Sequence, residues 1–247
     1  KHLGLHISPD LDTLMYTLSG KSNEDLGWGR KDESWNFLES FSAIGGDSWF
    51  NLGDRDLAVH VMRSQLLSKG LSLNAVTKDL YRRFGIEYSV LPMTNNRVAT
   101  RVVINGEEKA FQEYFVKEKC RPIIERVVYE GAGDASPTTD IERLLSDTKL
   151  SGIIICPSNP FLSVDPILSV KGLKEKLTSL DIPIVAVSPI IAGEAVKGPT
   201  GKIMQELGLK PSALGVAEHY DTLISGFVLD EADRTLQSQV ESLGLKV

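Results

Sequence analysis

The chain has 247 residues, of which 42% are hydrophobic and 24% are charged, as in ordinary globular proteins. Its formal net charge of −6 argues against a nucleic-acid binder, which needs a basic surface to displace counterions. No apolar run approaches the roughly 20 residues of a membrane-spanning helix. The two cysteines, Cys120 and Cys156, lack the spacing of a metal site or a disulfide framework. We therefore expect a cytoplasmic protein with reduced thiols and with neither a nucleic-acid nor a membrane partner.

Three segments in the first half carry helix signals. Residues 8–20 predict one helix, and residues 54–70 predict a second with Asp54 as its N-cap. Residues 72–85 predict a third helix that opens at Ser72. The buried stripe of the second helix is predicted to consist of Leu57, Val61, Met62 and Leu66.

The next segments predict strands. Residues 88–93 and 99–116 are rich in β-formers, and Asn105-Gly106 is a strong hairpin turn signal. We expect the block 50–118 to be a helical and hairpin insertion or cap on a core formed by residues 1–49 and 119–247.

The second half alternates apolar strand-like runs with helical patterns, which is the mark of a doubly wound α/β sheet. The predicted strands are 151–160, 182–193, 212–220 and 224–233. The helical patterns between them are 166–180 and 198–209.

Polar and glycine-rich loops follow two of these strands. In a parallel α/β sheet, ligands bind beyond the carboxyl ends of the strands. The alternative is that these are ordinary turns, because Ser, Asn, Gly and Pro also favour turns for local reasons. The candidate ligand-binding residues are Ser158, Asn159, Pro160, Ser188, Pro189, Ile190, Gly193, Lys197 and Gly198.

Two pairs of aspartates open the first two predicted helices. Asp10 and Asp12 lie two positions apart, and Asp54 and Asp56 repeat that spacing around Arg55. Carboxylates that face a phosphate need a hard cation between them, typically Mg²⁺, and an arginine can clamp phosphate directly. N-capping is the alternative, since it accounts by itself for aspartate at a helix start.

Aromatic residues cluster beside the second acidic pair. Trp28, Trp35, Trp49 and Phe50 fall within 23 positions of a chain that is only 7% aromatic. Such rings can stack on a flat heterocycle, although rings that fill a core would give the same pattern.

Taken together, the motifs SPDLDTLMYTLSG, GWGR, WFNLGDRDLAVHVMRSQLLSKG, LPMTNN, PSNP, VAVSPIIAGEAVKGPTGK and GVAEHYDTLISGFVLDEAD resemble the 2-phospho-L-lactate transferase family of coenzyme F420 biosynthesis. The resemblance covers nearly the whole chain. It implies an α/β fold with a Rossmann-like three-layer parallel sheet and a helical and hairpin insertion. It also implies transfer of a phospho-lactyl or phosphoenolpyruvyl-type group from a guanylylated donor to the deazaflavin alcohol Fo, with release of GMP and with Mg²⁺ as cofactor.

The resemblance also implies roles for individual residues. Asp10 and Asp12 would bind the metal or orient the attacking hydroxyl, and Arg55 would steady the phosphate charge. The strand loops would take the guanosine and phosphates of the donor. The remaining candidates are Asp54 and Asp56 for catalysis, Thr94, Asn95 and Asn96 for contacts to Fo, Trp49 for substrate binding and His60 as a weaker candidate base. A homodimer is the default expectation.

Family members start with a strand and a glycine-rich loop, and neither precedes Lys1, so we expect further sequence upstream. Two other functions stay open. One is a non-catalytic, sugar-nucleotide-binding regulator of the gluconeogenesis-factor type, and the other is a general nucleotide-sugar transferase. Which small acid the donor carries is also left open by the sequence.

Replacing Asp10 by asparagine tests whether this residue belongs to a site or only caps a helix. If it belongs to the site, turnover is abolished while the melting temperature changes no more than for a surface substitution. If it is a cap, activity persists and the free energy of unfolding falls by about 1 kcal/mol. Turnover and thermal unfolding of the same variant distinguish the two outcomes.

Overall fold

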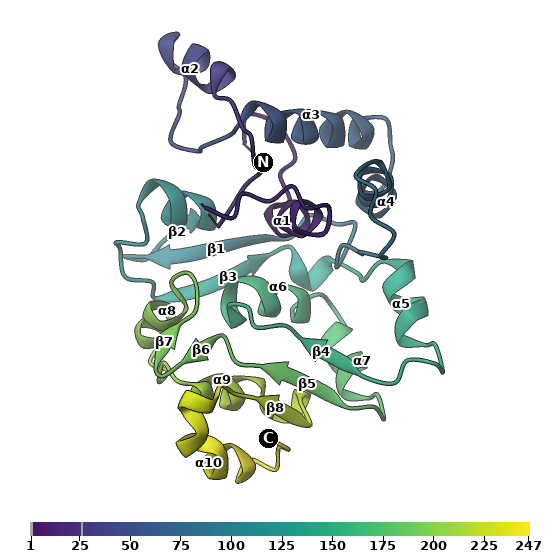
Figure 1. The fold of residues 1–247 in the computed structure, drawn as a ribbon, viewed down its shortest axis with the longest axis vertical. Helices are drawn as coiled ribbons and strands as arrows, with labels where there is room; N and C mark the ends of the chain where they lie inside the picture. Colours follow the sequence, from purple (N-terminus) through teal and green to yellow (C-terminus); the bar gives the residue numbers. More distant parts are fainter. Residues whose placement is uncertain (1, 26) are drawn as a thin grey trace. The chain divides into compact units, whose positions relative to one another are not determined.

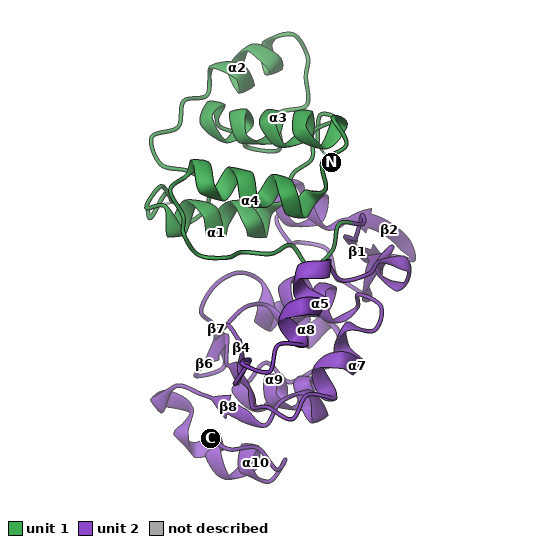
Figure 2. Ribbon diagram, turned by 90° about the vertical axis from the view of Figure 1, so that its right-hand side faces the viewer, with its two compact units in different colours: residues 1–95 green, residues 96–247 purple. Residues whose placement is uncertain are grey.

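The computed structural model describes residues 2–25 and 27–247, and the chain forms two compact units (Figure 2). The helical unit consists of residues 1–95, and the sheet unit consists of residues 96–247. Residues 1–49, expected in the α/β core, thus share a unit with the helices that follow them. The hairpin expected in the insertion belongs instead to the unit that holds the parallel sheet.

The helical unit contains four helices, α1 (Pro9–Leu18), α2 (Asn36–Ala43), α3 (Asp54–Ser68) and α4 (Leu73–Arg83). The three helices expected from the sequence are confirmed, and α2 is an addition. Figure 2 shows α3 between α2 and the pair formed by α1 and α4. The buried hydrophobic residues that hold this unit together are Met15, Tyr16, Val59, Val76, Leu80, Tyr81 and Ile86.

The inward face of α3 is not the one predicted. Val61 is 48% exposed and Met62 is 36% exposed, whereas Val59, His60 and Arg63 are buried. The prediction was wrong for Val61 and Met62 because it counted apolar residues alone, whereas Leu66 packs against the buried cluster and Leu57 is partly buried. Two polar side chains are turned inward here, where they meet charged partners on α1.

The sheet unit begins with an antiparallel sheet of order β2-β1-β3, from β1 (Ala99–Ile104), β2 (Glu107–Ala110) and β3 (Arg126–Glu130). The predicted hairpin turn is confirmed, since Asn105 and Gly106 both have positive φ angles of 51° and 76°, as such turns require. Two strand predictions were wrong. Residues 88–93 form no strand, and the end of 99–116 is a π-helical turn, η1 (Glu113–Lys117).

A parallel sheet of order β4-β5-β8 follows (Figure 1). It contains β4 (Ile153–Ile155), β5 (Ile184–Val187) and β8 (Gly226–Val228), with the short hairpin β6 (Ile190–Ile191) and β7 (Glu194–Ala195) directly after β5. The parallel α/β arrangement predicted from the alternating pattern is therefore confirmed.

Helices and short turns connect these strands, and their bounds are α5 (Thr139–Leu145), α6 (Asp165–Leu168), α7 (Leu173–Thr178), α8 (Thr200–Glu206), α9 (Ala213–Tyr220), α10 (Gln237–Glu241), η2 (Ala132–Asp134), η3 (Pro160–Val164), η4 (Asp221–Leu223) and η5 (Glu231–Leu236). The prediction of a strand at 212–220 was wrong, because this segment is α9. Ser212 caps it by accepting a hydrogen bond from the Gly215 N–H at 3.1 Å, so a start signal was present and was overlooked. The single helix expected at 166–180 is broken at Gly172, whose φ is +76°.

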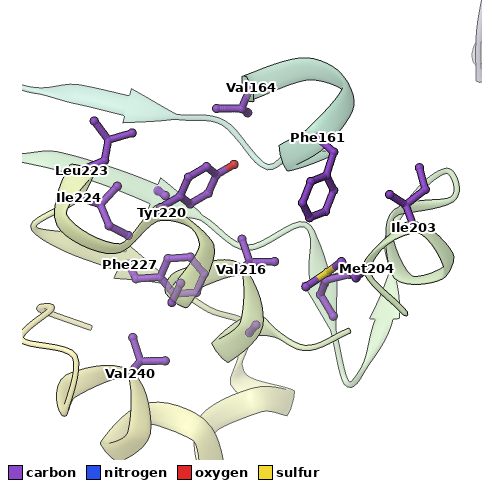
Figure 3. Close-up of a cluster of buried hydrophobic side chains, with 14 of the residues drawn as sticks. Phe161, Val164, Ile203, Met204, Val216, Tyr220, Leu223, Ile224, Phe227 and Val240 are labelled. Carbon is purple, nitrogen blue, oxygen red and sulfur yellow. The ribbon is translucent and has the colours of Figure 1, made fainter. Parts of the chain in front are cut away.

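The core of the sheet unit gathers side chains from η3, α8, α9, β8 and α10 around the parallel strands (Figure 3). Phe227 of the central apolar cluster is 1% exposed, and Val216 and Val240 are fully buried. Among the described residues, no helix has the length and apolar character needed to cross a bilayer.

Two carboxylates of the helical unit cap the starts of α2 and α3. Glu33, which precedes α2, caps α3, and Asp54, the first residue of α3, caps α2. Glu33 accepts hydrogen bonds from the backbone N–H groups of Arg55 and Asp56 at the start of α3. Asp54 in turn accepts from Ser34 and from the backbone of Asn36 and Phe37 at the start of α2. Gly53, not Asp54, is therefore the N-cap of α3, and the predicted cap was wrong.

The Asp54 cap makes stability depend on pH. Hydrogen bonds from Asn36, Ser34 and Phe37 hold the pKa of Asp54 at about 2, below the ordinary value of 3.8. The ionised carboxylate therefore stabilises the fold above about pH 4, and this contribution is lost as the pH falls from 3.8 through about 2. Asp54→Asn should be less stable than the wild type near neutral pH and equally stable near pH 2.

Urea unfolding across that pH range measures the difference. Asp181→Asn, at an exposed position of the sheet unit, is the control and should show no such trend. A stability difference that stays constant from neutral to acid pH would contradict the capping role of the Asp54 charge.

Candidate functional site

Three loops leave the same edge of the parallel sheet. In parallel strands the carboxyl ends lie side by side, so the segments after β4, β5 and β8 must emerge together. The Ser188 N–H donates to the carbonyl of Val228 at 2.9 Å, and the Ala192 N–H donates to the Asp233 carboxylate at 3.0 Å. The loops after β5 and β8 are thus joined directly.

The PSNP segment after β4 is shaped by Asn159. Its Oδ1 accepts hydrogen bonds from the backbone N–H groups of Phe161 at 3.0 Å and Leu162 at 3.2 Å, and so caps η3. Its Nδ2 is buried and has no hydrogen-bond partner among the described residues. Pro160 is buried and Ser158 is partly exposed. The oxygen of the Asn159 amide therefore has the local, turn-forming role that was the alternative to ligand binding. The nitrogen of the same amide is a buried donor without a hydrogen-bond partner among the described residues.

The loop after β5 is held from within. The Ser188 hydroxyl donates to the carbonyl of Ile190 at 2.7 Å and accepts from its N–H at 3.1 Å. Pro189 is buried with the Ile190 side chain, so this turn is rigid. Gly193 and Gly198 have φ angles of +82° and +73°. Their predicted ligand contacts stay predictions.

The lysines near this loop differ. Lys197 is exposed. Lys202 on α8 instead donates to the carbonyl of Pro122 at 2.9 Å and pairs with Glu206. A ligand contact of Lys197 stays a prediction.

Asp233 was missed by the sequence analysis. It is only 6% exposed, and its carboxylate fixes Ala192, whose φ of +52° is unusual for a residue with a side chain. A carboxylate closely following the third parallel strand was the signal that could have identified it.

A second, partly buried acid lies directly after the PSNP segment and η3. Asp165, directly after η3, lies 3.0 Å from Nε2 of His219 on α9. Tyr129 of β3 donates to the carbonyl of Phe161 at 2.7 Å. These contacts tie the segment that follows PSNP to β3 and α9, and they line a small cavity together with Lys174.

In the helical unit the GDRD motif divides into three different environments. Asp54 caps α2, as described above. Arg55 is 51% exposed, and its nearest acidic neighbour is the equally open Asp32 at 3.7 Å, so its guanidinium is accessible to a ligand. Asp56 accepts hydrogen bonds from the Tyr16 hydroxyl and lies 3.3 Å from Nε2 of His60.

The SPDLDT motif is divided in the same way. Asp10 is exposed. Asp12 is 4% exposed, and both of its carboxylate oxygens accept hydrogen bonds from the buried guanidinium of Arg63. Arg63 and Tyr16 lie at interior positions of predicted helices and belong to no recognisable site motif, so the sequence alone does not point to them.

Asp56 also faces a small hollow of the helical unit. The hollow is lined by Asn23, Trp28, Gly29, Arg30, Glu33, Trp35, Asn51, Gly53 and Asp56. Two of the four clustered aromatics, Trp28 and Trp35, are therefore at this hollow. The other two, Trp49 and Phe50, pack edge to face at 5.7 Å beside His2.

The LPMTNN motif supports local backbone. Thr94 is buried, Asn95 Oδ1 accepts from the Asn74 N–H at the start of α4, and Asn96 Oδ1 accepts from the Ser136 N–H. Contacts from these residues to Fo stay a prediction.

Magnesium needs open oxygen ligands. Asp10 is an exposed residue, although burial raises the pKa of its carboxyl group, whereas both oxygens of Asp12 are engaged by Arg63. Within residues 2–25 and 27–247, no group of three or more His, Cys, Asp or Glu side chains could hold a metal ion. A requirement for Mg²⁺ stays a prediction.

The structure thus gathers the candidate residues in two places. The sheet unit joins the loops after β4, β5 and β8, and the helical unit joins Asp12 to Asp56 through buried partners. Convergence of the two groups on one ligand stays a prediction.

Removing the buried cation should destabilise the helical unit strongly. Arg63→Met leaves the Asp12 carboxylate buried without its partner, which costs about 3–5 kcal/mol. Arg82→Met, which removes an exposed cation paired with Asp79, should cost about 0.5 kcal/mol or less. Urea unfolding of both variants makes the comparison, and equal costs would contradict the assignment of Asp12 and Arg63 as a buried ion pair.

Comparison with known proteins identifies the family. A sequence model of the 2-phospho-L-lactate transferase CofD family matches residues 1–243. The phosphoenolpyruvate transferase of Streptomyces coelicolor is 39% identical over 98% of this chain and 77% of its own length. The 2-phospho-L-lactate transferase of Methanococcoides burtonii is 38% identical over 98% of this chain and 78% of its own length.

The fold has a counterpart among solved structures. A crystal structure of a Bacillus halodurans protein aligns with a TM-score of 0.52 at 16% identity, covering 96% of this chain and 76% of that protein. At this identity the match concerns the fold alone, and it agrees with the α/β, Rossmann-like class expected from the sequence. By its match to the sequence model over residues 1–243, the chain belongs to the 2-phospho-L-lactate transferase CofD family and is a transferase.

Proposed function

We propose that this protein transfers a phospho-acid group from a guanylylated donor to the primary alcohol of the deazaflavin Fo, with release of GMP, in coenzyme F420 biosynthesis. The match to the CofD family over residues 1–243 is the observation that carries this proposal. Relatives named for phosphoenolpyruvate and for 2-phospho-L-lactate are 39% and 38% identical to the chain. Overall similarity therefore does not choose between the two acids.

The proposed reaction is a displacement at phosphorus. The Fo hydroxyl oxygen attacks the phosphorus that carries the small acid, and a new P–O bond to Fo forms. The P–O bond to the GMP phosphate breaks, GMP leaves with that electron pair, and the hydroxyl proton is lost to a base. Such reactions require positioning and charge stabilisation more than covalent catalysis by the protein.

The sheet unit is suited to hold the donor. Its joined loops present a buried amide donor at Asn159 and glycines of positive φ at Gly193 and Gly198, where backbone can approach a ligand closely. Lys197, which directly precedes Gly198, adds a positive charge to the loop after β5. These features support binding of the guanosine diphosphate portion of the donor.

The helical unit supplies open groups of both signs. Arg55 is the exposed cation of GDRD and can clamp a phosphate oxygen pair. Asp10 is the exposed acid of SPDLDT, and we propose it as the group that orients the attacking hydroxyl. Trp28 and Trp35 lie at the small hollow beside Asp56, and the face of an indole ring can stack on a flat ring system such as a deazaflavin.

Mg²⁺ and a homodimer belong to the same proposal. A bound Mg²⁺ would neutralise charge on the diphosphate, and Asp10 is the carboxylate open to it. We assign no step of the reaction to the ion. Loss of turnover on addition of EDTA, restored by excess Mg²⁺, would support the metal requirement.

The test is incubation of the protein with Fo, Mg²⁺ and each guanylylated donor in turn, carrying phospholactate, phosphoenolpyruvate or phosphoglycerate. We expect GMP release that depends on Fo, together with a product whose mass identifies the acid transferred. Arg55→Ala should reduce kcat/KM by about 10-fold or more if it clamps the phosphate. Tight nucleotide binding without GMP release would instead indicate a regulator, and turnover of GDP-sugars that ignores Fo would indicate a sugar transferase.

A further inference from the structure

A chain of hydrogen-bonded side chains runs through the interior of the helical unit and links the SPDLDT and GDRD motifs. Its members are Asp12, Arg63, His60, Asp56 and Tyr16. Arg63 and His60 are 2% and 1% exposed, and Asp12 and Tyr16 are buried as well. The proposed function uses the exposed Asp10 and Arg55 of these two motifs, and it leaves the members of this hydrogen-bonded chain without a role.

The direction of the hydrogen bonds in this chain of side chains, from Arg63 through His60 to Asp56, follows from the chemistry of the groups. The Arg63 guanidinium has only donors, and its Nη1 lies 3.2 Å from Nδ1 of His60, so that ring nitrogen accepts. The proton of the neutral imidazole is then on Nε2, which lies 3.3 Å from Oδ2 of Asp56 and donates to it. His60 therefore relays a hydrogen bond from Arg63 to Asp56.

The opposite oxygen of Asp56 is fixed as well. Tyr16 donates its hydroxyl proton to Oδ1 of Asp56. Burial and the neighbouring carboxylate raise the pKa of Tyr16, so the phenol keeps the proton that it donates. Burial raises the pKa of Asp56, and the hydrogen bonds from His60 and Tyr16 lower it, with the balance below its ordinary value. Asp56 is thus an ionised carboxylate held by one donor on each oxygen.

Asp56 is also the member of this chain that reaches the surface. Its side chain is 20% exposed, whereas the side chains of His60, Arg63 and Asp12 are exposed by 2%, 3% and 6%. It opens onto the hollow lined by Trp28 and Trp35. A carboxylate in this setting can accept a hydrogen bond from a hydroxyl or N–H group of a flat ligand.

A contribution to folding stability does not by itself explain why these charged side chains are buried together. Buried ionic groups cost desolvation energy, and well-packed apolar residues of similar volume often stabilise a core as well or better. The helical unit nevertheless places an arginine, a histidine and a tyrosine around one carboxylate that faces a hollow. We propose that Tyr16, His60 and Arg63 are positioning residues that hold the Asp56 carboxylate in the correct orientation for the acceptor substrate. This inference rests on the proposed function.

Two substitutions of His60 separate its donor from its acceptor. In His60→Gln the side-chain amide nitrogen takes the place of Nε2 and keeps the donor to Asp56. In His60→Asn the shorter amide can meet Arg63 through its oxygen but loses the donor to Asp56. We expect kcat to fall by about 10-fold in His60→Asn, as for a lost hydrogen bond to a charged group, and by much less in His60→Gln, with little change in the KM for the donor in either variant.

Two tyrosines provide a matched pair for the other oxygen. Tyr16→Phe removes the donor to Asp56, whereas Tyr81→Phe removes a hydroxyl that donates to the carbonyl of Leu11 at 2.6 Å in the same unit. Both variants lose one buried hydrogen bond, so both should lower the melting temperature by a similar small amount. We expect about a 10-fold loss of kcat in Tyr16→Phe alone.

These experiments distinguish failure of the positioning role from failure of the proposed function. If the wild type turns over but His60→Asn matches His60→Gln, and Tyr16→Phe matches Tyr81→Phe, the positioning role is overturned and the function stands. If the wild type releases no GMP with any donor, the function and this role are overturned together. Ring nitrogen-15 shifts of His60 report the hydrogen-bond chain without turnover, with the proton expected on Nε2, and a proton on Nδ1 would overturn the assigned direction.

Discussion

The charge of Arg63 inside the helical unit decides how that unit is built. A guanidinium group has five N–H donors and no acceptor, so a buried guanidinium must be surrounded by hydrogen-bond acceptors. It finds them in the carboxylate of Asp12 on α1, in the carbonyl of His6 before α1 and in the ring of His60 on its own helix. This demand explains why α3 turns His60 and Arg63 inward while Val61 and Met62 stay partly exposed. One buried cation thus fixes both the rotation of α3 and the position of the first acidic motif.

Most of the local structure could be predicted from the sequence, because its signals act over a few residues. The helix starts near Pro9 and Ser72, the Asn105-Gly106 turn and three parallel strands follow from capping, turn chemistry and apolar runs. The failures have a common cause in long-range contacts. The inward face of α3 depends on Asp12, which is distant in sequence. Segment 212–220 has the composition of a strand but packs as the helix α9, because Ser212 caps it and the sheet needs a covering layer there.

The two roles of an aspartate near a helix start could not be separated in the sequence, since capping and ligand binding favour the same residue at the same place. The structure separates them by neighbours. Asp54 serves the backbone of α2, and Asp12 serves Arg63, whereas Asp10 remains exposed and Asp56 is held at the edge of a hollow. Identical spacing in the two motifs therefore conceals four different environments. Exposure and hydrogen-bond partners, rather than spacing, identify which carboxylates have oxygens left for a ligand.

The same division of labour appears in the sheet unit. The Asp233 carboxylate accepts a hydrogen bond from the Ala192 backbone N–H, and Asn159 Oδ1 accepts one from the Phe161 N–H in η3. Acidic and polar side chains therefore hold these loops in place. Among the described residues, the amide nitrogen of Asn159 has no hydrogen-bond partner. In the helical unit the side chain of Arg55 is half exposed. Phosphoryl transfer depends on fixed donors and positive charge around a diphosphate, and rigid loops avoid the entropy cost of arranging them at each turnover. The buried acids Asp12 and Asp233 thus hold neighbouring side chains and backbone in place within their own units.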